Sequence, residues 1–166
     1  MVVKKRARSE RDKQKRKEKL LKTAWRLYKK NKGQMPTVLQ IAERAGLSKG
    51  AVYLYFKTKE EIFLQLYVHQ LREWFEHVDV ALLNHPGSIT AKELAAIMTQ
   101  YVIDNPLLLK MGSIARGVLE EKTDEQIVIE TKMQVANLLE DCGRQINEKF
   151  PDVNISDAAR LDLHIY

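Results

Sequence analysis

Between residues 37 and 61 the chain reads TVLQIAERAGLSKGAVYLYFKTKEE. Apolar residues recur in this segment at spacings of three and four, which is typical of helices. Thr37 and Gln40 form the pattern of a capping box at the start of one short helix, and Gly46 marks its end. Ser48 can cap a second helix directly after this glycine. The segment therefore predicts two short helices joined by a tight turn, a geometry suited to docking in the major groove of DNA.

The second of these short helices is predicted to have two distinct sides. Val52 and Phe56 should pack inward. The opposite side then offers a bare backbone, an aromatic hydroxyl and two cations, and all of these suit the edge of a DNA groove: Lys49, Gly50, Tyr53 and Lys57.

Helical periodicity continues on both sides of this segment, so we expect an all-α fold. The chain contains only 7 Gly and 4 Pro. An apolar stripe that begins at Leu20 stops at Gly33, a residue typical of helix ends. Thr58 and Glu61 repeat the capping-box pattern and open a helix of roughly 26 residues, about 39 Å long, which the sequence NHPG at 84–87 breaks.

Three more helices are predicted in the rear of the chain. Thr90 with Glu93 starts the first, and Thr123 with Gln126 starts the last. Between them, Pro106 suits the first turn of a helix. The inward positions of that middle helix, read from its periodicity, are Leu108, Met111, Ile114 and Val118.

The end of the sequence contains a further start signal. Pro151 stops the last of these helices, and Ser156 can cap another that has barely begun at Tyr166. We therefore expect the C-terminal helical region to be incomplete.

Charge is divided unevenly along the chain. Residues 1–60 carry 19 Lys and Arg against 5 Asp and Glu, a net charge of +14, whereas residues 61–166 carry 9 against 17, a net charge of −8. Residues 4–22 alone hold 11 cations and 3 anions. A basic front indicates a polyanionic partner, because cationic side chains displace counterions from a phosphate backbone. On charge alone, a solvated tail without a function explains residues 4–22 equally well.

Several classes of protein are disfavoured by what the sequence lacks. Cys142 is the single cysteine and the first residues run into charge with no secretory signal, so we expect a cytoplasmic protein. No apolar run approaches the roughly 20 residues that cross a bilayer. Phosphate-cradling glycine loops, zinc-protease pairs and elbow-type serines are missing, so we expect neither an enzyme nor a cofactor.

The long helix that starts at residue 58 carries one candidate set of metal ligands. His69, Glu73 and His77 recur there at a spacing of four, which can recruit a metal. No further histidine or cysteine cluster completes the set. We interpret these residues as a solvated flank and expect no metal, and we interpret Cys142 as a small buried apolar residue.

The segment at residues 37–61 resembles the signature of the tetracycline-repressor family of bacterial transcriptional regulators. The resemblance depends on the AGLS turn at 45–48, KGAVY at 49–53, and Phe56 followed by TKEE at 58–61. Strong similarity runs from Leu20 to Leu66. It implies a helix-turn-helix DNA-binding domain at residues 20–64, a basic arm at 1–19, and a helical ligand-binding and dimerisation domain at 65–166.

The resemblance also implies roles for individual residues. Phosphate contacts are implied for Thr37 and Lys59, which lie at helix starts whose free amides attract anions, and for the Tyr53 hydroxyl. Base contacts are implied for Lys49 and Gly50, at the start of the recognition helix. Relatives often have histidine at Tyr55 and a polar base reader at Leu39, so base recognition is expected to depend on the third helix and the basic arm. The implied DNA contacts are Thr37, Ser48, Lys49, Gly50, Tyr53, Tyr55 and Lys59.

For the rear domain, the resemblance implies a homodimer and a small-molecule inducer. Methionine and aromatic side chains adapt to varied ligands, although a packed helical core would use the same side chains. The candidates for an apolar pocket are Trp74, Phe75, Met98, Tyr101, Met111 and Ile114, together with Met133.

These patterns predict a sequence-specific, ligand-responsive repressor that binds a near-palindromic operator as a dimer. The alternative is a nonspecific, nucleoid-type DNA-binding protein, because a basic arm alone gives salt-sensitive binding to any duplex.

Overall fold

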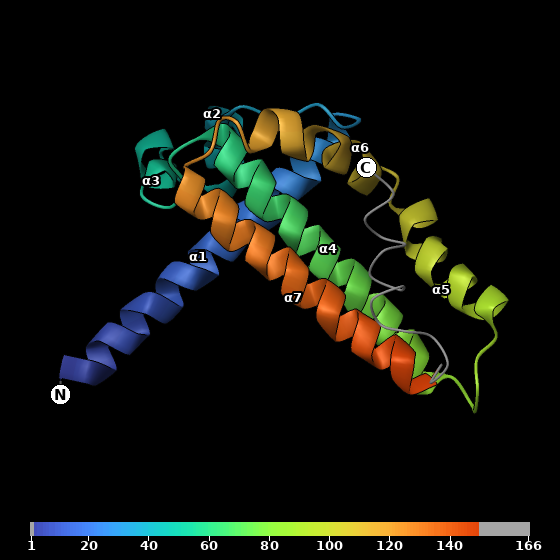
Figure 1. Ribbon diagram of the computed structural model, residues 1–166. Helices are drawn as coiled ribbons and strands as arrows, with labels where there is room; N and C mark the ends of the chain where they lie inside the picture. Colours follow the sequence, from blue (N-terminus) through green and yellow to red (C-terminus); the bar gives the residue numbers. More distant parts are fainter. Residues whose placement is uncertain (1, 150–166) are drawn as a thin grey trace.

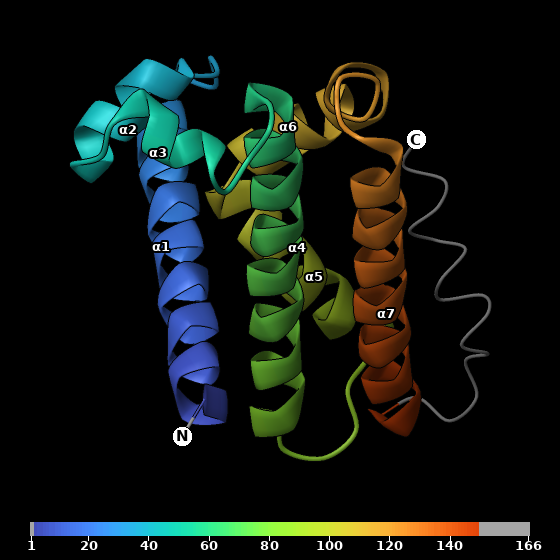
Figure 2. The ribbon, with the colours of Figure 1, turned by 90° about the vertical axis from the view of Figure 1, so that its left-hand side faces the viewer.

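The computed structural model describes residues 2–149, with side-chain surroundings from Glu10 onward, and every regular element in this range is helical. α4 lies at the centre, between α1 on one side and α7 on the other (Figures 1 and 2). This architecture confirms the predicted all-α fold class. In chain order the elements are α1 (Val2–Lys30), α2 (Val38–Ala45), α3 (Lys49–Tyr53), α4 (Lys59–Asn84), α5 (Ala91–Asp104), α6 (Leu107–Ile114), the π-helical turn η1 (Ala115–Leu119) and α7 (Glu125–Lys149).

Two helices begin with the capping boxes that the sequence predicts. At α2, the Gln40 N–H donates to Thr37 Oγ1 at 3.2 Å, and the Thr37 N–H donates to Gln40 Oε1 at 2.8 Å. Thr90 and Glu93 make the same pair of bonds at α5. Each box satisfies two helix-end amides that would otherwise lack an acceptor.

Only one of the two hydrogen bonds of the predicted capping box at α4 is present, so the prediction is wrong for the other. Thr58 Oγ1 accepts the Glu61 N–H at 2.9 Å, as predicted. The Glu61 carboxylate, however, accepts the Lys57 N–H at 2.6 Å instead of turning back to Thr58. The glutamate thereby holds the backbone that enters α4.

The predicted start of α7 is also corrected. Asp124, not Thr123, caps this helix, because Asp124 Oδ1 accepts the Gln126 N–H at 3.1 Å. The Thr123 hydroxyl instead donates to the Leu119 carbonyl oxygen at 2.7 Å. Asp124 directly precedes the helix and is a stronger capping residue than threonine.

The helix after Pro106 departs from its predicted register. α6 ends at Ile114, and the π-helical turn η1 follows. A π turn contains an extra residue and rotates the side chains that follow it. Ala115 and Leu119 are therefore buried, whereas Val118, predicted to point inward, is only half-buried.

Buried apolar side chains form two clusters along α4. The front core joins α1, α2, α3 and the first part of α4 with α6 and η1, so the short helices and part of the rear of the chain share one apolar core. It consists of Leu20, Leu21, Ala24, Tyr28, Val38, Ile41, Ala42, Ala45, Val52, Phe56, Ile62, Phe63, Leu64, Leu66, Met111, Ala115 and Leu119. The rear core joins the second half of α4 with α7 and consists of Leu71, Phe75, Val78, Leu82, Ile89, Leu108, Cys142 and Ile146.

Residues 2–19, predicted as a basic arm, form the N-terminal part of α1, which projects from the rest of the chain (Figure 1). Two lysines in this part of the helix contact α2 and the segment that follows α3. Lys19 Nζ donates to the Ala45 carbonyl oxygen at the end of α2 at 2.9 Å. Lys17 Nζ lies 5.5 Å from the centre of the Phe56 ring, and partial burial lowers its pKa. These two cations thus have contacts within the protein.

The predicted stop at Pro151 and the helix predicted from Ser156 lie outside the described residues. Within residues 2–149, no helix has both the length and the apolar character needed to cross a bilayer.

Candidate nucleic-acid interface

The turn between α2 and α3 depends on Gly46. This residue has φ +71° and ψ 36°, in the left-handed region where glycine has no steric penalty. Its N–H donates to the Glu43 carbonyl oxygen at 3.1 Å, and the Leu47 N–H donates to the Ala42 carbonyl oxygen at 2.9 Å. These bonds close the end of α2 and direct the chain into α3.

The two predicted sides of α3 are confirmed. Val52 is fully buried and Phe56 is 1% exposed, so both side chains anchor the segment in the front core. The residues of the opposite side are exposed: Lys49, Gly50, Tyr53 and Lys57.

A hollow of about 430 Å³ lies where this exposed side meets the starts of α2 and α4. Its lining is contributed by three helix starts that are separate in the sequence. Four of the seven predicted DNA contacts meet here: Thr37, Lys49, Tyr53 and Lys59. The other lining residues are Val38, Leu39, Lys57, Thr58 and Glu60.

The remaining three predicted contacts differ in position. Ser48 Oγ accepts the Ala51 N–H at 3.1 Å, and its hydroxyl proton has no acceptor among residues 2–149, so it can donate to a phosphate. Gly50 is exposed, and a Cβ there would meet nothing closer than Ser48 Oγ at 4.0 Å. Tyr55 is half-buried against the front core and does not line the hollow.

Charge in the hollow favours an anion. Lys59 is the first residue of α4, where its cation opposes the positive end of the helix dipole. Its Nζ lies 3.8 Å from Glu60 Oε1, a loose ion pair. Lys49 Nζ lies 5.9 Å from the centre of the exposed Tyr53 ring. A phosphate in the hollow would therefore relieve the unfavourable charge at the start of α4.

Five of the lining residues are not among the seven predicted contacts, and they include Leu39 and Lys57. Leu39 is 49% exposed and lines the hollow together with Lys49 and Tyr53. An exposed leucine in a polar hollow can contact the methyl group of thymine. Lys57, which the sequence predicts to suit the edge of a DNA groove, also lines the hollow. The available signal for Leu39 was its position two residues after the Thr37 cap, on the side of α2 opposite Ile41.

The six candidates for an inducer pocket separate into two groups. Trp74, Phe75, Met98 and Tyr101 lie together in or against the rear core. Met111 is fully buried in the front core, and Ile114 packs against that core. The packing of α6 on α4 explains this separation, which the sequence did not predict.

The aromatic residues of the first group link α4 to α5. Trp74 Nε1 donates to the Met98 carbonyl oxygen at 2.8 Å, and the His77 and Tyr101 ring centres are 5.5 Å apart. Burial, with a smaller effect of Glu73, raises the pKa of Tyr101 to about 12. The tyrosine thus keeps its proton at physiological pH.

A separate groove of about 350 Å³ lies between α1, α4 and α7. Its lining is mostly polar and includes none of the six pocket candidates. His69, on this lining, has Nδ1 3.5 Å from Glu73 Oε1, while the His77 ring packs at a tilt against Tyr101, so the three residues of the candidate metal site make other contacts.

Comparison with known proteins agrees with this arrangement. Residues 20–66 match the family model of bacterial regulatory proteins of the tetR family, and residues 68–166 match a tetracyclin repressor-like C-terminal domain. YerO of Bacillus subtilis, described as an uncharacterized HTH-type transcriptional regulator, is 28% identical over 159 residues, 91% of this chain and 54% of that protein. The fatty acid metabolism regulator protein of B. subtilis is 28% identical over 102 residues, 61% of this chain and 49% of that protein. The chain spans about half the length of these curated relatives.

Solved structures share the fold. The fatty acid degradation regulator FadR from Bacillus halodurans superposes with a TM-score of 0.56 at 17% identity, covering 89% of this chain and 78% of that one. A putative tetR family transcription regulator from Shewanella sp. PV-4 gives 0.52 at 19% identity, covering 78% of this chain and 69% of that one. With two family models matched in succession along its length, the chain belongs to the tetracycline-repressor family, whose members are DNA-binding transcription factors and not enzymes.

Proposed function

We propose that the chain is a sequence-specific, ligand-responsive repressor that binds a near-palindromic operator as a homodimer. The observation that carries the proposal is the hollow where Thr37, Lys49, Tyr53 and Lys59 meet from three helix starts. We further propose that residues 20–64 act as the DNA-binding domain, residues 1–19 as a basic arm, and residues 65–166 as the domain for dimerisation and ligand binding.

Within the hollow, the residues divide into two roles. Lys59 and Tyr53 bind phosphate and set the position of α3, while Lys49 and the exposed Leu39 contact base edges. Ser48, whose hydroxyl proton is free among the described residues, adds a phosphate contact at the start of α3. The Thr37 hydroxyl already bonds with Gln40, so its contact with phosphate requires Gln40 to release it.

The test separates these roles with two lysine variants. DNA fragments are selected from a random library with the unaltered chain, with Lys49→Ala and with Lys59→Ala. Lys49→Ala should change the selected sequence, whereas Lys59→Ala should keep it and lower the salt slope of binding by roughly one. If Lys49→Ala recovers the same sequence as the unaltered chain, Lys49 does not read bases.

The same selection decides against the nucleoid-type alternative. A specific regulator should hold its selected duplex about a thousandfold or more tightly than random DNA at physiological salt. The selected site should contain two related half-sites about one helical turn or a little more apart, as a twofold dimer requires. A library that returns no preferred sequence would favour the nonspecific alternative.

The proposed ligand site lies between α4 and α5. α5 has no fully buried residue, and its apolar side chains are only partly covered, so displacing it costs little packing. Trp74, Phe75, Met98 and Tyr101 gather at this contact. The relative named as a fatty acid metabolism regulator supports an effector with an apolar chain. We therefore propose an amphipathic inducer that enters beside these four side chains.

A further inference from the structure

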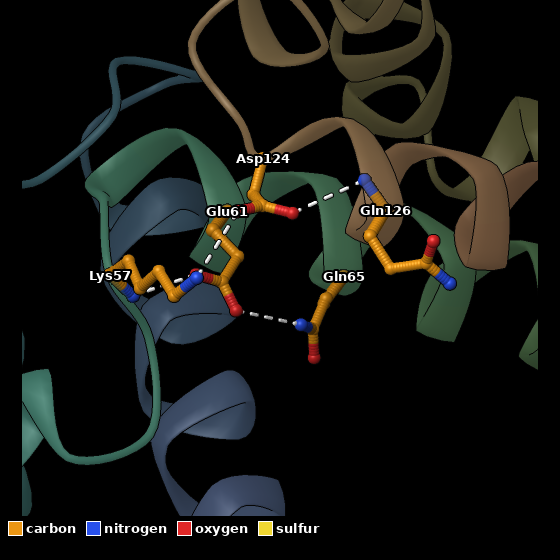
Figure 3. A network of polar contacts seen from close by, with 5 residues as sticks. All are labelled: Lys57, Glu61, Gln65, Asp124 and Gln126. Atoms are coloured by element: carbon orange, nitrogen blue, oxygen red, sulfur yellow. Dashed lines mark hydrogen bonds and ion pairs between the residues drawn. The ribbon is translucent and has the colours of Figure 1, made fainter.

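Lys57 lies in the turn between α3 and α4 and lines the hollow together with Lys49 and Lys59. Its side chain is 71% exposed, yet its ammonium group does not point freely into solvent. Lys57 Nζ lies 3.1 Å from Asp124 Oδ2, across 67 positions of sequence (Figure 3). A cation on the proposed DNA-binding surface is thus bound to a carboxylate from the start of α7.

Further hydrogen bonds hold both partners of this ion pair in place, through the backbone of Lys57 and the carboxylate of Asp124. Glu61, a carboxylate only 4% exposed, accepts the Lys57 N–H at 2.6 Å and the Gln65 side-chain amide at 3.1 Å. Asp124 uses its other oxygen, Oδ1, to accept the Gln126 N–H at the start of α7. Figure 3 shows the five residues together. The pairing therefore reflects how α4 and α7 pack, and does not depend on two freely moving side chains.

The ion pair is well placed to be exchanged for DNA. Asp124 is exposed and its carboxylate offers the same kind of acceptor as a phosphate oxygen, so a duplex in the hollow competes for the same ammonium group. An exposed pair between long or solvated groups is weak and is screened by salt. The Lys57 hydrogen bond and charge also lower the pKa of Asp124, so the competitor stays ionised at neutral pH.

We propose that Lys57 is a further phosphate-binding residue and that Asp124 is an internal competitor that holds it in the DNA-free protein. The assignment rests on the proposed function, because it concerns the same surface. Binding to DNA breaks the Lys57–Asp124 pair and forms a Lys57–phosphate pair in its place. Since Asp124 belongs to the start of α7, any movement of that helix relative to α4 changes how strongly Lys57 is withheld from DNA.

The experiment compares Asp124→Asn with the matched control Glu125→Gln in the full chain. Both variants remove one negative charge from the start of α7, but only the first removes the ion pair. Asparagine also keeps an oxygen for the Gln126 N–H, so the helix cap survives. Asp124→Asn should bind a labelled duplex about two- to fivefold more tightly than the control. It should also show a salt slope steeper by nearly one.

Lys57→Gln in both backgrounds identifies the responsible cation. It should cost more affinity in the Asp124→Asn chain than in the unaltered chain, because only there is Lys57 free to bind phosphate without competition. The proposal is overturned if Asp124→Asn and Glu125→Gln behave alike. It is equally overturned if the gain from Asp124→Asn persists in the Lys57→Gln chain, since simple repulsion between Asp124 and DNA would then explain it.

The duplexes used are one recovered by selection and one of random sequence. Phosphate exchange requires no particular sequence, so the effect should be present on both. A chain that shows the exchange but no preference for the selected duplex refutes the specific regulator and leaves the exchange standing. Asp124→Ser, which also preserves the cap, repeats the measurement if the asparagine variant does not fold.

Discussion

Gly50 is the second residue of α3, and its exposed backbone lies next to the hollow that we assign to DNA. Alanine at this position meets no atom closer than 4.0 Å, so Gly50→Ala should keep or raise the stability of the fold, by up to about 1 kcal/mol. The added methyl group should nevertheless weaken DNA binding about tenfold, because it prevents close approach of the backbone. Thermal unfolding and duplex titration measure the two effects separately.

Gly117→Ala provides the matched control. Gly117 is exposed in η1, and a Cβ there meets nothing within 4 Å. This variant should leave DNA binding unchanged. Equal DNA affinities for the two alanine variants would show that no close approach occurs at Gly50.

Asp79 on α4 is a partly buried carboxylate that we expect to destabilise the fold. Its Oδ1 is buried without a hydrogen-bond partner in the described part of the chain. Burial, followed by the charges of Asp141 and Glu76, raises its pKa. The folded-state pKa is thus above the unfolded value, so the ionised carboxylate destabilises the fold at neutral pH. That cost disappears as the pH falls through the raised pKa.

Asp79→Asn should therefore stabilise the protein at neutral pH by about 0.5–1 kcal/mol, a value reduced for partial exposure. The difference from the unaltered chain should shrink as the pH falls through the raised pKa of Asp79. Urea unfolding at several pH values measures it, with the exposed Glu121→Gln as the control for loss of one charge. A less stable asparagine variant at neutral pH would contradict this account of Asp79.

Among the helices, α1 has two parts that differ in composition and burial. Leu20, Leu21, Ala24 and Tyr28 belong to the front core, whereas residues 1–16 carry 8 Lys and Arg, and those of them whose surroundings the structure describes, 10–16, are exposed. A chain that lacks residues 1–16 should therefore fold normally and keep the contacts of Lys17 and Lys19. It should bind selected and random duplexes equally less well, with a flatter salt dependence.

The effect of the charges in α1 can be separated from the effect of helix length without shortening the chain. Replacing the exposed Arg11, Lys13 and Lys15 by glutamine keeps the helix length but removes three cations. Salt-dependent titration should show a smaller slope for this variant as well. Unchanged binding of both variants at low salt would rule out a contribution of the arm.

Over the whole molecule, α4 joins the two proposed sites. It runs for 26 residues from Lys59 at the hollow to Asn84, and Trp74 lies in its far half. An inducer that displaces α5 from Trp74 should tilt α4 and move the two recognition helices of a dimer out of register. Ligand and DNA must then weaken each other's binding by the same factor, typically about 5- to 150-fold.

Trp74 fluorescence measures this coupling in a Trp25→Phe chain, because the protein contains only 2 Trp. A saturated fatty acid is the first compound to titrate, with and without saturating operator duplex. Its affinity should be lower in the presence of operator. Equal affinities for a compound that releases the operator would exclude this mechanism.

Much of the fold followed from short-range patterns. The capping boxes at Thr37 and Thr90, the glycine turn at Gly46 and the two sides of α3 all depend on contacts within about four residues, which sequence spacing reports directly. Two predictions that were wrong, the cap of α7 and the register after α6, also have physical reasons. Asp124 replaced Thr123 as a cap because two adjacent residues compete for one helix end, and periodicity carries no sign of the π turn that moved Leu119 inward.

The surface that we assign to DNA could be located only from the tertiary structure. The sequence singled out Thr37, Lys49, Tyr53 and Lys59 one by one through family resemblance and local chemistry, but only the packing of three helix starts brings them around one hollow. The ion pair of Lys57 and Asp124 could not be predicted from the sequence, because the residues around each one give no sign that the two side chains meet. Helix formation is decided by neighbours along the chain, whereas ion pairs across 67 positions exist only after α4 and α7 have packed side by side (Figure 1).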